Sequence, residues 1–220
     1  MQLPLNDNNP TLFTTEKESQ YFDRKSARIA PKDTIRHICA FANASGGKLV
    51  IGIEDHGSIT GFKGTGAHDI EEFEQAALVG CDPVPEVHPV RIPVINEQGK
   101  SDNILVLEIA PSSGHVISRR SDKVVFLRQK DSSVVLDRDQ VLALEYDKNQ
   151  RRFEDEVETR SSINDVDPEV MARYKTELGT SASDEQILRS RGFLHDGHLT
   201  NAGVLLFSEN PTKFMPWARV

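Results

Sequence analysis

The stretch that decides the expected fold is Lys48-Leu49-Val50-Ile51-Gly52-Ile53, an apolar run rich in β-branched residues. Such a run is typical of a buried strand. Before it, Pro31-Lys32-Asp33-Thr34 opens a segment with apolar residues at helical spacing, which predicts a helix that ends where Gly46-Gly47 release the chain. After it, Glu54–Ser58 is typical of a turn and Ile59–Phe62 of a short return strand. A helix followed by a buried strand therefore forms the centre of the first domain.

The segments that follow add one helix, three strands and a further helix. In chain order, these are expected at Asp69–Val79, Val87–Ile95, Asn103–Ala110, Lys123–Arg128 and from Asp137 onward. Helices and strands in this irregular order indicate an α+β domain, with helices packed on a mixed or antiparallel sheet.

Domain organisation follows from composition along the chain. The order expected is a flexible arm, an α+β domain, a charged linker and a winged-helix-like unit, over residues 1–15, 16–148, 149–167 and 168–220. The last unit contains the capping sequence Ser183-Asp184-Glu185-Gln186, which predicts a helix start. The apolar ending Trp217–Val220 resembles the start of another strand, so we expect a truncated chain.

The net charge of −8 does not decide whether the chain binds nucleic acid. Residues 145–169 contain nine acidic and four basic residues, so this segment carries −5 of the total and the remainder is near balance. Phosphate binding depends on local basic patches rather than on the sum. The charge therefore leaves a nucleic-acid partner open.

Cysteine usage and hydropathy bear on the compartment. Cys39 and Cys81 are far apart and have no CxxC partner, which excludes a disulfide framework and a Cys-based zinc site. We therefore expect a reducing, cytoplasmic setting. No apolar run approaches the ~18 residues that cross a bilayer, so no membrane partner is expected.

Three carboxylates flank the predicted helix and strand: Glu18, Asp23 and Asp55. Converging carboxylates are the ligands that Mg²⁺ and Mn²⁺ prefer. Such a metal activates water and neutralises charge on a phosphate, and Lys25 adds a further cation. The pattern thus suggests phosphodiester hydrolysis, with the three acids as metal ligands and with these acids and Lys25 as catalytic groups.

Spacing sets a condition on that site. In an extended segment, alternation places Asp23 and Lys25 on one face and Arg24 on the other. Glu18 lies five positions from Asp23, so the two share a metal only if the chain bends between them. The alternative that spacing leaves open is that all three acids are surface groups, with Asp55 as a turn former.

Two blocks of sequence carry a family resemblance. They are Glu18-Ser19-Gln20-Tyr21-Phe22-Asp23-Arg24-Lys25 and the stretch 40–55, which contains Ala-Phe-Ala-Asn, Gly-Gly and Ile-Gly and is followed by Gly57, Ile59 and Gly61. The chain resembles the Schlafen/AlbA-like family of nucleic-acid-binding domains, most strongly over 18–62. The resemblance implies a divalent-metal-dependent endoribonuclease that acts on structured RNA such as tRNA. Its three acids fall on Glu18, Asp23 and either Asp55 or its neighbour Glu54.

The resemblance also contains departures and alternatives. The family usually has Glu where this chain has Asp23, and the shorter side chain would have to sit closer to a metal. Many relatives are DNA-binding, so the alternative function is a non-catalytic DNA-binding transcriptional regulator. Residues 199–211 resemble the segment after this domain in larger bacterial members that continue into an ATPase-like region, although no nucleotide site is evident here. A protein-interaction scaffold is a third class that the acidic balance keeps open.

Basic residues gather in two segments, which suits a groove that contacts several phosphates. The candidates are Arg24, Arg28, Lys32, Arg36, Arg119, Arg120, Lys123, Arg128 and Lys130. Asn43 with Gly46 and Gly47 forms either a phosphate cradle or a tight helix end, of which the helix end is favoured. The expected partner is RNA or DNA, and a homo-oligomer is compatible with the sequence.

Overall fold

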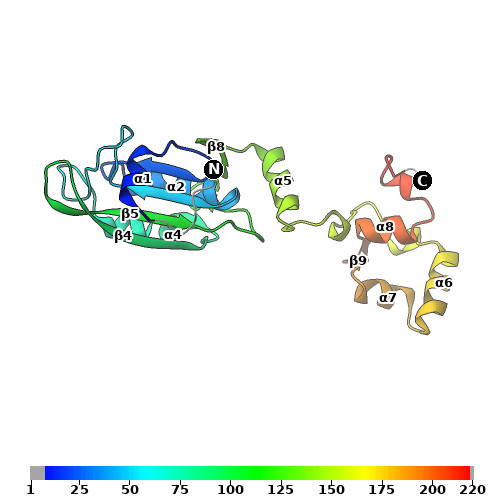
Figure 1. Cartoon of the computed structure of the whole chain (residues 1–220). Coiled ribbons are helices and arrows are strands. Elements are labelled where there is room, and N and C mark those ends of the chain that lie inside the picture. The colour runs from blue at the N-terminus through cyan, green and yellow to red at the C-terminus, as the bar shows by residue number, and fades with distance from the viewer. Residues whose placement is uncertain (1–7, 219–220) are drawn as a thin grey trace. The chain divides into compact units, whose positions relative to one another are not determined.

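The computed structural model describes residues 8–218, and the chain divides between Gln150 and Arg151 into two compact units (Figure 1). The first unit is built on a four-stranded sheet with the order β1-β2-β5-β4. These strands are β1 (Phe22–Lys25), β2 (Gly47–Ile51), β5 (Ser101–Ile109) and β4 (Val87–Ile95). β1 runs parallel to β2, whereas β5 is antiparallel to both of its neighbours, so the sheet is mixed. The predicted α+β class is confirmed.

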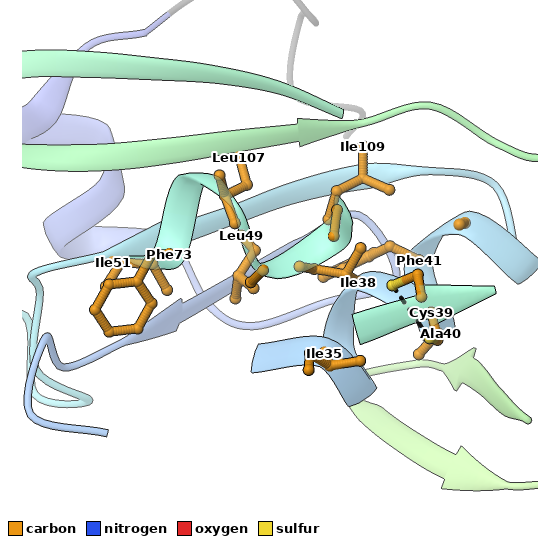
Figure 2. Packing of buried hydrophobic residues seen from close by; sticks show 14 of the residues in the cluster. Ile35, Ile38, Cys39, Ala40, Phe41, Leu49, Ile51, Phe73, Leu107 and Ile109 are labelled. Atoms are coloured by element: carbon orange, nitrogen blue, oxygen red, sulfur yellow. Dashed lines mark hydrogen bonds between the residues drawn. The ribbon is translucent and has the colours of Figure 1, made fainter. Parts of the chain in front are cut away.

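One face of the sheet is covered by α2 (Pro31–Asn43), α3 (Ile70–Glu74) and α4 (Ala76–Gly80). Figure 2 shows Ile38 and Phe41 of α2 packed with Leu49 of the sheet in the largest apolar cluster. Burying this face removes a large apolar area from water, which is the main stabilising contribution to the unit. The segment 69–79, expected as one helix, is two short helices that meet at Gln75.

The opposite face is covered by α1 (Pro10–Thr15). The ring of Phe13 is fully buried and stacks on Phe22 at a centroid distance of 5.9 Å. The guanidinium of Arg24 donates to the carbonyl oxygens of Phe13 and Thr14, at 2.8 and 3.0 Å. The prediction of a flexible arm over 1–15 is therefore wrong for this helix, because the apolar face of β1 needs a cover. Residues 1–7 of the expected arm lie outside the described residues.

Two small antiparallel pairs and a helix complete the first unit. They are β3 (Cys81–Asp82) with β6 (Ser118–Arg119), β7 (Phe126–Gln129) with β8 (Ser132–Val135), and α5 (Arg138–Asp147). Asn43, the last residue of α2, joins them to the core: its amide donates to the carbonyls of Ile117 and Phe126 at 2.7 and 2.8 Å. The side-chain oxygen Oδ1 of Asn43 accepts from the Ile117 N–H at 2.7 Å. The end of α2 thus anchors the segment that carries β6 and β7.

The second unit contains α6 (Pro168–Leu178), α7 (Asp184–Ser190), the hairpin of β9 (Leu194–His195) and β10 (His198–Leu199), and α8 (Asn201–Phe207). Three 3₁₀ turns complete it: η1 (Phe153–Asp155), η2 (Ile163–Asp165) and η3 (Pro211–Lys213). Ser183 caps α7 as predicted, with Gln186 completing the capping box. The assignment as a winged helix stays a prediction.

Part of the stretch 149–167, expected as a linker, is packed within the second unit. The Ser161 hydroxyl is buried and accepts from the Leu199 N–H at 2.8 Å. Val157 forms a β-bridge with Thr200. These contacts hold a segment whose charged composition alone predicts a solvated linker. Of the strand expected at 217–220, Trp217 and Ala218 are not in a strand, and the last two residues lie outside the described residues. Over residues 8–218, no helix is both long enough and apolar enough to span a bilayer.

Candidate nucleic-acid interface

The structure brings Glu18, Asp23 and Lys25 together at the start of β1. The Lys25 ammonium donates to a carboxylate oxygen of each acid, and its Nζ lies 3.0 Å from Oε1 of Glu18. A bend at Gln20 and Tyr21 makes this contact possible, as the odd spacing of the two acids requires. Asp23 and Lys25 lie on one face of β1 because their side chains alternate with that of Arg24.

The second carboxylate oxygen of Asp23 faces α2 and β7. Oδ2 lies 2.7 Å from Nη1 of Arg128 and 3.1 Å from Nδ1 of His37. The Arg128 guanidinium also donates to the Ser19 and Phe22 carbonyls at 3.0 and 3.1 Å. Asp23 is 1% exposed, so this is a buried ion pair with its remaining hydrogen-bonding groups satisfied.

Burial and charge set the protonation states in this cluster. Burial raises the pKa of Asp23, but hydrogen bonds with His37, Glu18 and Lys25 outweigh it and hold that pKa well below its usual range. Burial, and then Asp23, raise the pKa of Glu18 against the opposing effect of Lys25. Burial also lowers the pKa of His37, whose Nε2 accepts from Arg36 Nε at 3.1 Å. Asp23 is therefore the firmly ionised centre, beside a neutral histidine.

Asp55, the third predicted acid, does not join the cluster. It lies in the exposed turn after β2. Its neighbour Glu54 accepts from the hydroxyls of Ser26 and Thr60 at 2.8 and 2.9 Å, and its Oε1 lies 3.4 Å from Nη1 of Arg28. Glu54 is thus bound to residues that follow β1 and to Thr60, and among the described residues no hydrogen bond or ion pair joins it to Glu18 or Asp23.

The arrangement does not fit the divalent cation that the resemblance implies. The Lys25 ammonium lies between Glu18 and Asp23, in the place that a shared cation would take. In the part of the chain that the structure describes, no three His, Cys, Asp or Glu side chains gather as metal ligands. The predicted grouping of Glu18, Asp23 and Asp55 is corrected accordingly: Asp55 stays apart, and the ammonium of Lys25 lies between the two acids that meet.

Two of the predicted phosphate-binding cations are buried instead. Arg24 holds α1 against the sheet, and Arg128 pairs with Asp23. A guanidinium that is enclosed by protein and donates to carbonyl or carboxylate oxygens there cannot reach a phosphate in solvent. Their prediction as backbone contacts is therefore wrong. The exposed candidates are Arg28, Lys32, Arg36, Arg120, Lys123 and Lys130, together with the partly exposed Arg119.

Three of these cations line one cleft of about 500 Å³. This cleft, here named the cationic cleft, lies among α2, α4 and the turn after β6. Its lining is Lys32, Asp33, Ile35, Val79, Gly80, Arg119, Arg120 and Ser121. It joins the two basic segments that the sequence shows separately. The helix predicted over 69–79 includes Val79, but only the tertiary fold places Val79 and Gly80 beside Arg120.

The cations of the cationic cleft differ in how far they are already paired. Arg119 is paired with Asp122 at 2.6 Å, and the neighbouring Lys123 forms a salt bridge with Asp82. The Arg120 guanidinium donates to the Cys81 carbonyl oxygen at 2.8 Å, which positions it without neutralising it. Within residues 8–218, neither Lys32 nor Arg120 forms a salt bridge. Because Asp33 is the one carboxylate of the lining, these two cations leave the cleft with a net positive charge.

Gly46 and Gly47, which follow α2, have a structural role. Gly46 has a φ of +73°, and a Cβ there would lie 2.6 Å from the Ile109 carbonyl oxygen. At Gly47 a Cβ would lie 2.7 Å from the ring of Phe41. With Asn43 occupied by Ile117 and Phe126, this turn is the tight helix end that the sequence favours rather than a phosphate cradle.

Comparison with known proteins places this unit in a family. The family model described as Schlafen, AlbA_2 matches residues 18–137, more than half of the 220 residues. None of the curated proteins compared matches the chain. Among solved structures, the DIP2311 protein from Corynebacterium diphtheriae is similar at 24% identity and a TM-score of 0.44, over 90% of this chain and 38% of that one. The family match spans β1, α2, β2 and the cationic cleft, and the chain belongs to the Schlafen AlbA_2 family.

Proposed function

We propose that this protein binds nucleic acid through the phosphate backbone, and that the cationic cleft is the point of contact. The observation that carries the proposal is the convergence of Lys32, Arg119 and Arg120 on one cleft with a single carboxylate, Asp33. Family membership supports nucleic acid as the ligand class. RNA and DNA share the phosphate that this cleft would contact, so either polymer satisfies it.

The electrostatics of the cationic cleft favour an anion. Lys32 and Arg120 form no salt bridge within residues 8–218, and they outnumber Asp33, the one carboxylate of the lining. An exposed ion pair such as that of Arg119 with Asp122 is worth only about 0–1 kcal/mol, so a phosphate can compete for it. Arg36 follows Lys32 by four positions on α2, so the two side chains lie on one helix face and extend the positive surface. Several cations in reach of one strand are what backbone binding requires.

In this proposal the Glu18–Asp23–Lys25 cluster has a structural role. It joins β1 to α2 and β7 through Asp23, and no cleavage step is assigned to it. The endoribonuclease activity that the resemblance implies would require a cation where the Lys25 ammonium lies. Binding without cleavage is the function that the described geometry supports best.

Charge reversal tests the proposal. Labelled single-stranded RNA and DNA would be titrated with the full chain and with Lys32→Glu and Arg120→Glu, following fluorescence anisotropy. Each variant should bind at least about tenfold more weakly, since a favourable phosphate contact becomes repulsive. Lys100→Glu is the matched control, because Lys100 is exposed and lies outside the cationic cleft. Equal loss in Lys100→Glu would mean that only net charge matters and would refute the assignment.

A further inference from the structure

A second cleft adjoins the cationic cleft. It has a volume of about 250 Å³ and lies among α2, α3 and α4. This apolar cleft is lined by Pro31, Lys32, Ile35, Glu72, Gln75, Ala76 and Val79. Lys32, Ile35 and Val79 line both clefts, so a ligand can extend from one into the other.

The walls of the apolar cleft differ from those of its neighbour. Ile35, Ala76 and Val79 supply hydrocarbon surface, and Val79 is 66% exposed despite being a large apolar residue. Gln75 offers both a donor and an acceptor at the mouth, and Glu72 offers acceptors. Apolar walls with a few polar groups are typical of small-molecule sites, and this volume is just below the roughly 300 Å³ at which drug-sized pockets begin. A single planar ring system is the fitting size.

Charge orients whatever occupies the two clefts. Glu72 belongs to the apolar cleft alone and repels a phosphate, whereas Arg119 and Arg120 belong to the cationic cleft alone and attract one. A ligand that spans both therefore has an anionic end and an uncharged, ring-shaped end with hydrogen-bonding edges. A nucleotide unit of a polynucleotide has these two parts.

We infer that the apolar cleft holds the base of an unpaired nucleotide whose phosphate lies in the cationic cleft, an inference that rests on the proposed function. A base within a duplex is stacked and its pairing edge is occupied, and taking it out costs a few kcal/mol. The protein therefore binds single strands more tightly than duplexes. Carboxylate and amide groups such as Glu72 and Gln75 pair with the amino groups of cytosine and adenine, which makes these the favoured bases.

The test compares a short labelled single strand with the duplex of the same sequence, using the full chain. Val79→Ser removes hydrocarbon surface and should weaken single-strand binding about three- to tenfold while leaving duplex binding unchanged. Ile95→Ser is the matched control, because Ile95 is 65% exposed, close to the 66% of Val79, and lines neither cleft. It should change neither affinity. Because Val79 is exposed, its substitution should leave the far-UV circular dichroism spectrum unchanged.

Gln75→Ala provides a second, independent test of the base site, because Gln75 lines the apolar cleft and not the cationic cleft. It should reduce the preference for adenine- and cytosine-containing strands over uracil-only strands. If Val79→Ser and Gln75→Ala bind single strands like the unmodified protein while Lys32→Glu binds weakly, the base site is refuted and the phosphate site stands. If Lys32→Glu and Arg120→Glu also bind normally, the proposed function itself fails.

Discussion

The Nη1 atom of Arg128 lies 2.7 Å from Oδ2 of Asp23, and both side chains are buried although they are 105 positions apart in the chain. This pair links β1 at one edge of the sheet to β7 in the small hairpin. The guanidinium also lies over the ring of Phe41, 4.7 Å from its centroid. One buried arginine thus connects β1, α2 and β7.

Removing one partner of this pair should destabilise the domain strongly. Arg128→Met leaves Oδ2 of the buried Asp23 carboxylate without its arginine partner, while Lys25 still contacts Oδ1. Breaking a buried pair typically costs about 3–5 kcal/mol. We expect a loss of that size in the free energy of unfolding, measured by urea denaturation. Lys130→Met, at an exposed position of the same hairpin, controls for the loss of a cation. A change in Arg128→Met no larger than in the control would contradict the buried pair.

The stability that Asp23 contributes should depend on pH in a defined direction. Its pKa is lowered in the folded state, so its contribution is complete above the unfolded-state value of about 3.9 and is lost as the pH falls below it. We expect the difference in unfolding free energy between the unmodified protein and Asp23→Asn to shrink from pH 6 toward pH 3. The slope with pH is set by the protons that the unfolded state binds in excess of the folded state. Asp55→Asn, at an exposed turn position, should show a small difference without this trend. A constant difference for Asp23→Asn would be incompatible with the assigned ionisation.

Lys25 should control the protonation of Glu18. Its charge opposes the burial and the Asp23 carboxylate that raise the pKa of Glu18. In Lys25→Met we therefore expect that pKa to rise further, as followed by carbon-detected NMR titration of the Glu18 carboxyl. Because two carboxylates then face each other without the ammonium, added Mn²⁺ should also raise the Tm of this variant more than that of the unmodified protein. An unchanged Glu18 titration would show that Lys25 is not its neutralising partner.

Asn43 should be among the most sensitive polar residues of the first unit. Its side-chain amide is hydrogen-bonded to the carbonyl and the N–H of Ile117, next to β6, and to the carbonyl of Phe126 in β7. Asn43→Ala leaves three backbone groups without partners, each at a cost of about 1–3 kcal/mol, so we expect a lower Tm by differential scanning calorimetry. Asn43→Asp keeps the acceptor for the Ile117 N–H, but it loses both donor contacts and places a carboxylate oxygen against the two carbonyls, so its Tm should fall as well. A Tm in Asn43→Ala equal to that of the unmodified protein would contradict the anchoring of this segment.

Local sequence patterns predict much of the fold but only part of the candidate site. The alternation along β1 places Asp23 and Lys25 on one face, and the odd spacing from Glu18 demands the bend that occurs at Gln20. Such features depend on neighbours in the chain, so sequence reasoning reaches them. The burial of Arg128 and the meeting of Lys32 with Arg120, 88 positions later, depend on how distant segments pack. The identity of a basic residue alone does not show whether its side chain faces solvent or a buried carboxylate.

The salt dependence of binding tests the central claim most directly. The affinity of the full chain for a single-stranded oligonucleotide would be measured at several salt concentrations, for the unmodified protein, Lys32→Ala/Arg120→Ala and Lys100→Ala. Each phosphate contact contributes about 0.7 to the slope of log K against log salt for a single strand. We expect the double variant to lose about 1.4 from that slope, the sum for two contacts, while Lys100→Ala keeps it. A slope in the double variant equal to that of the unmodified protein would contradict phosphate binding in the cationic cleft.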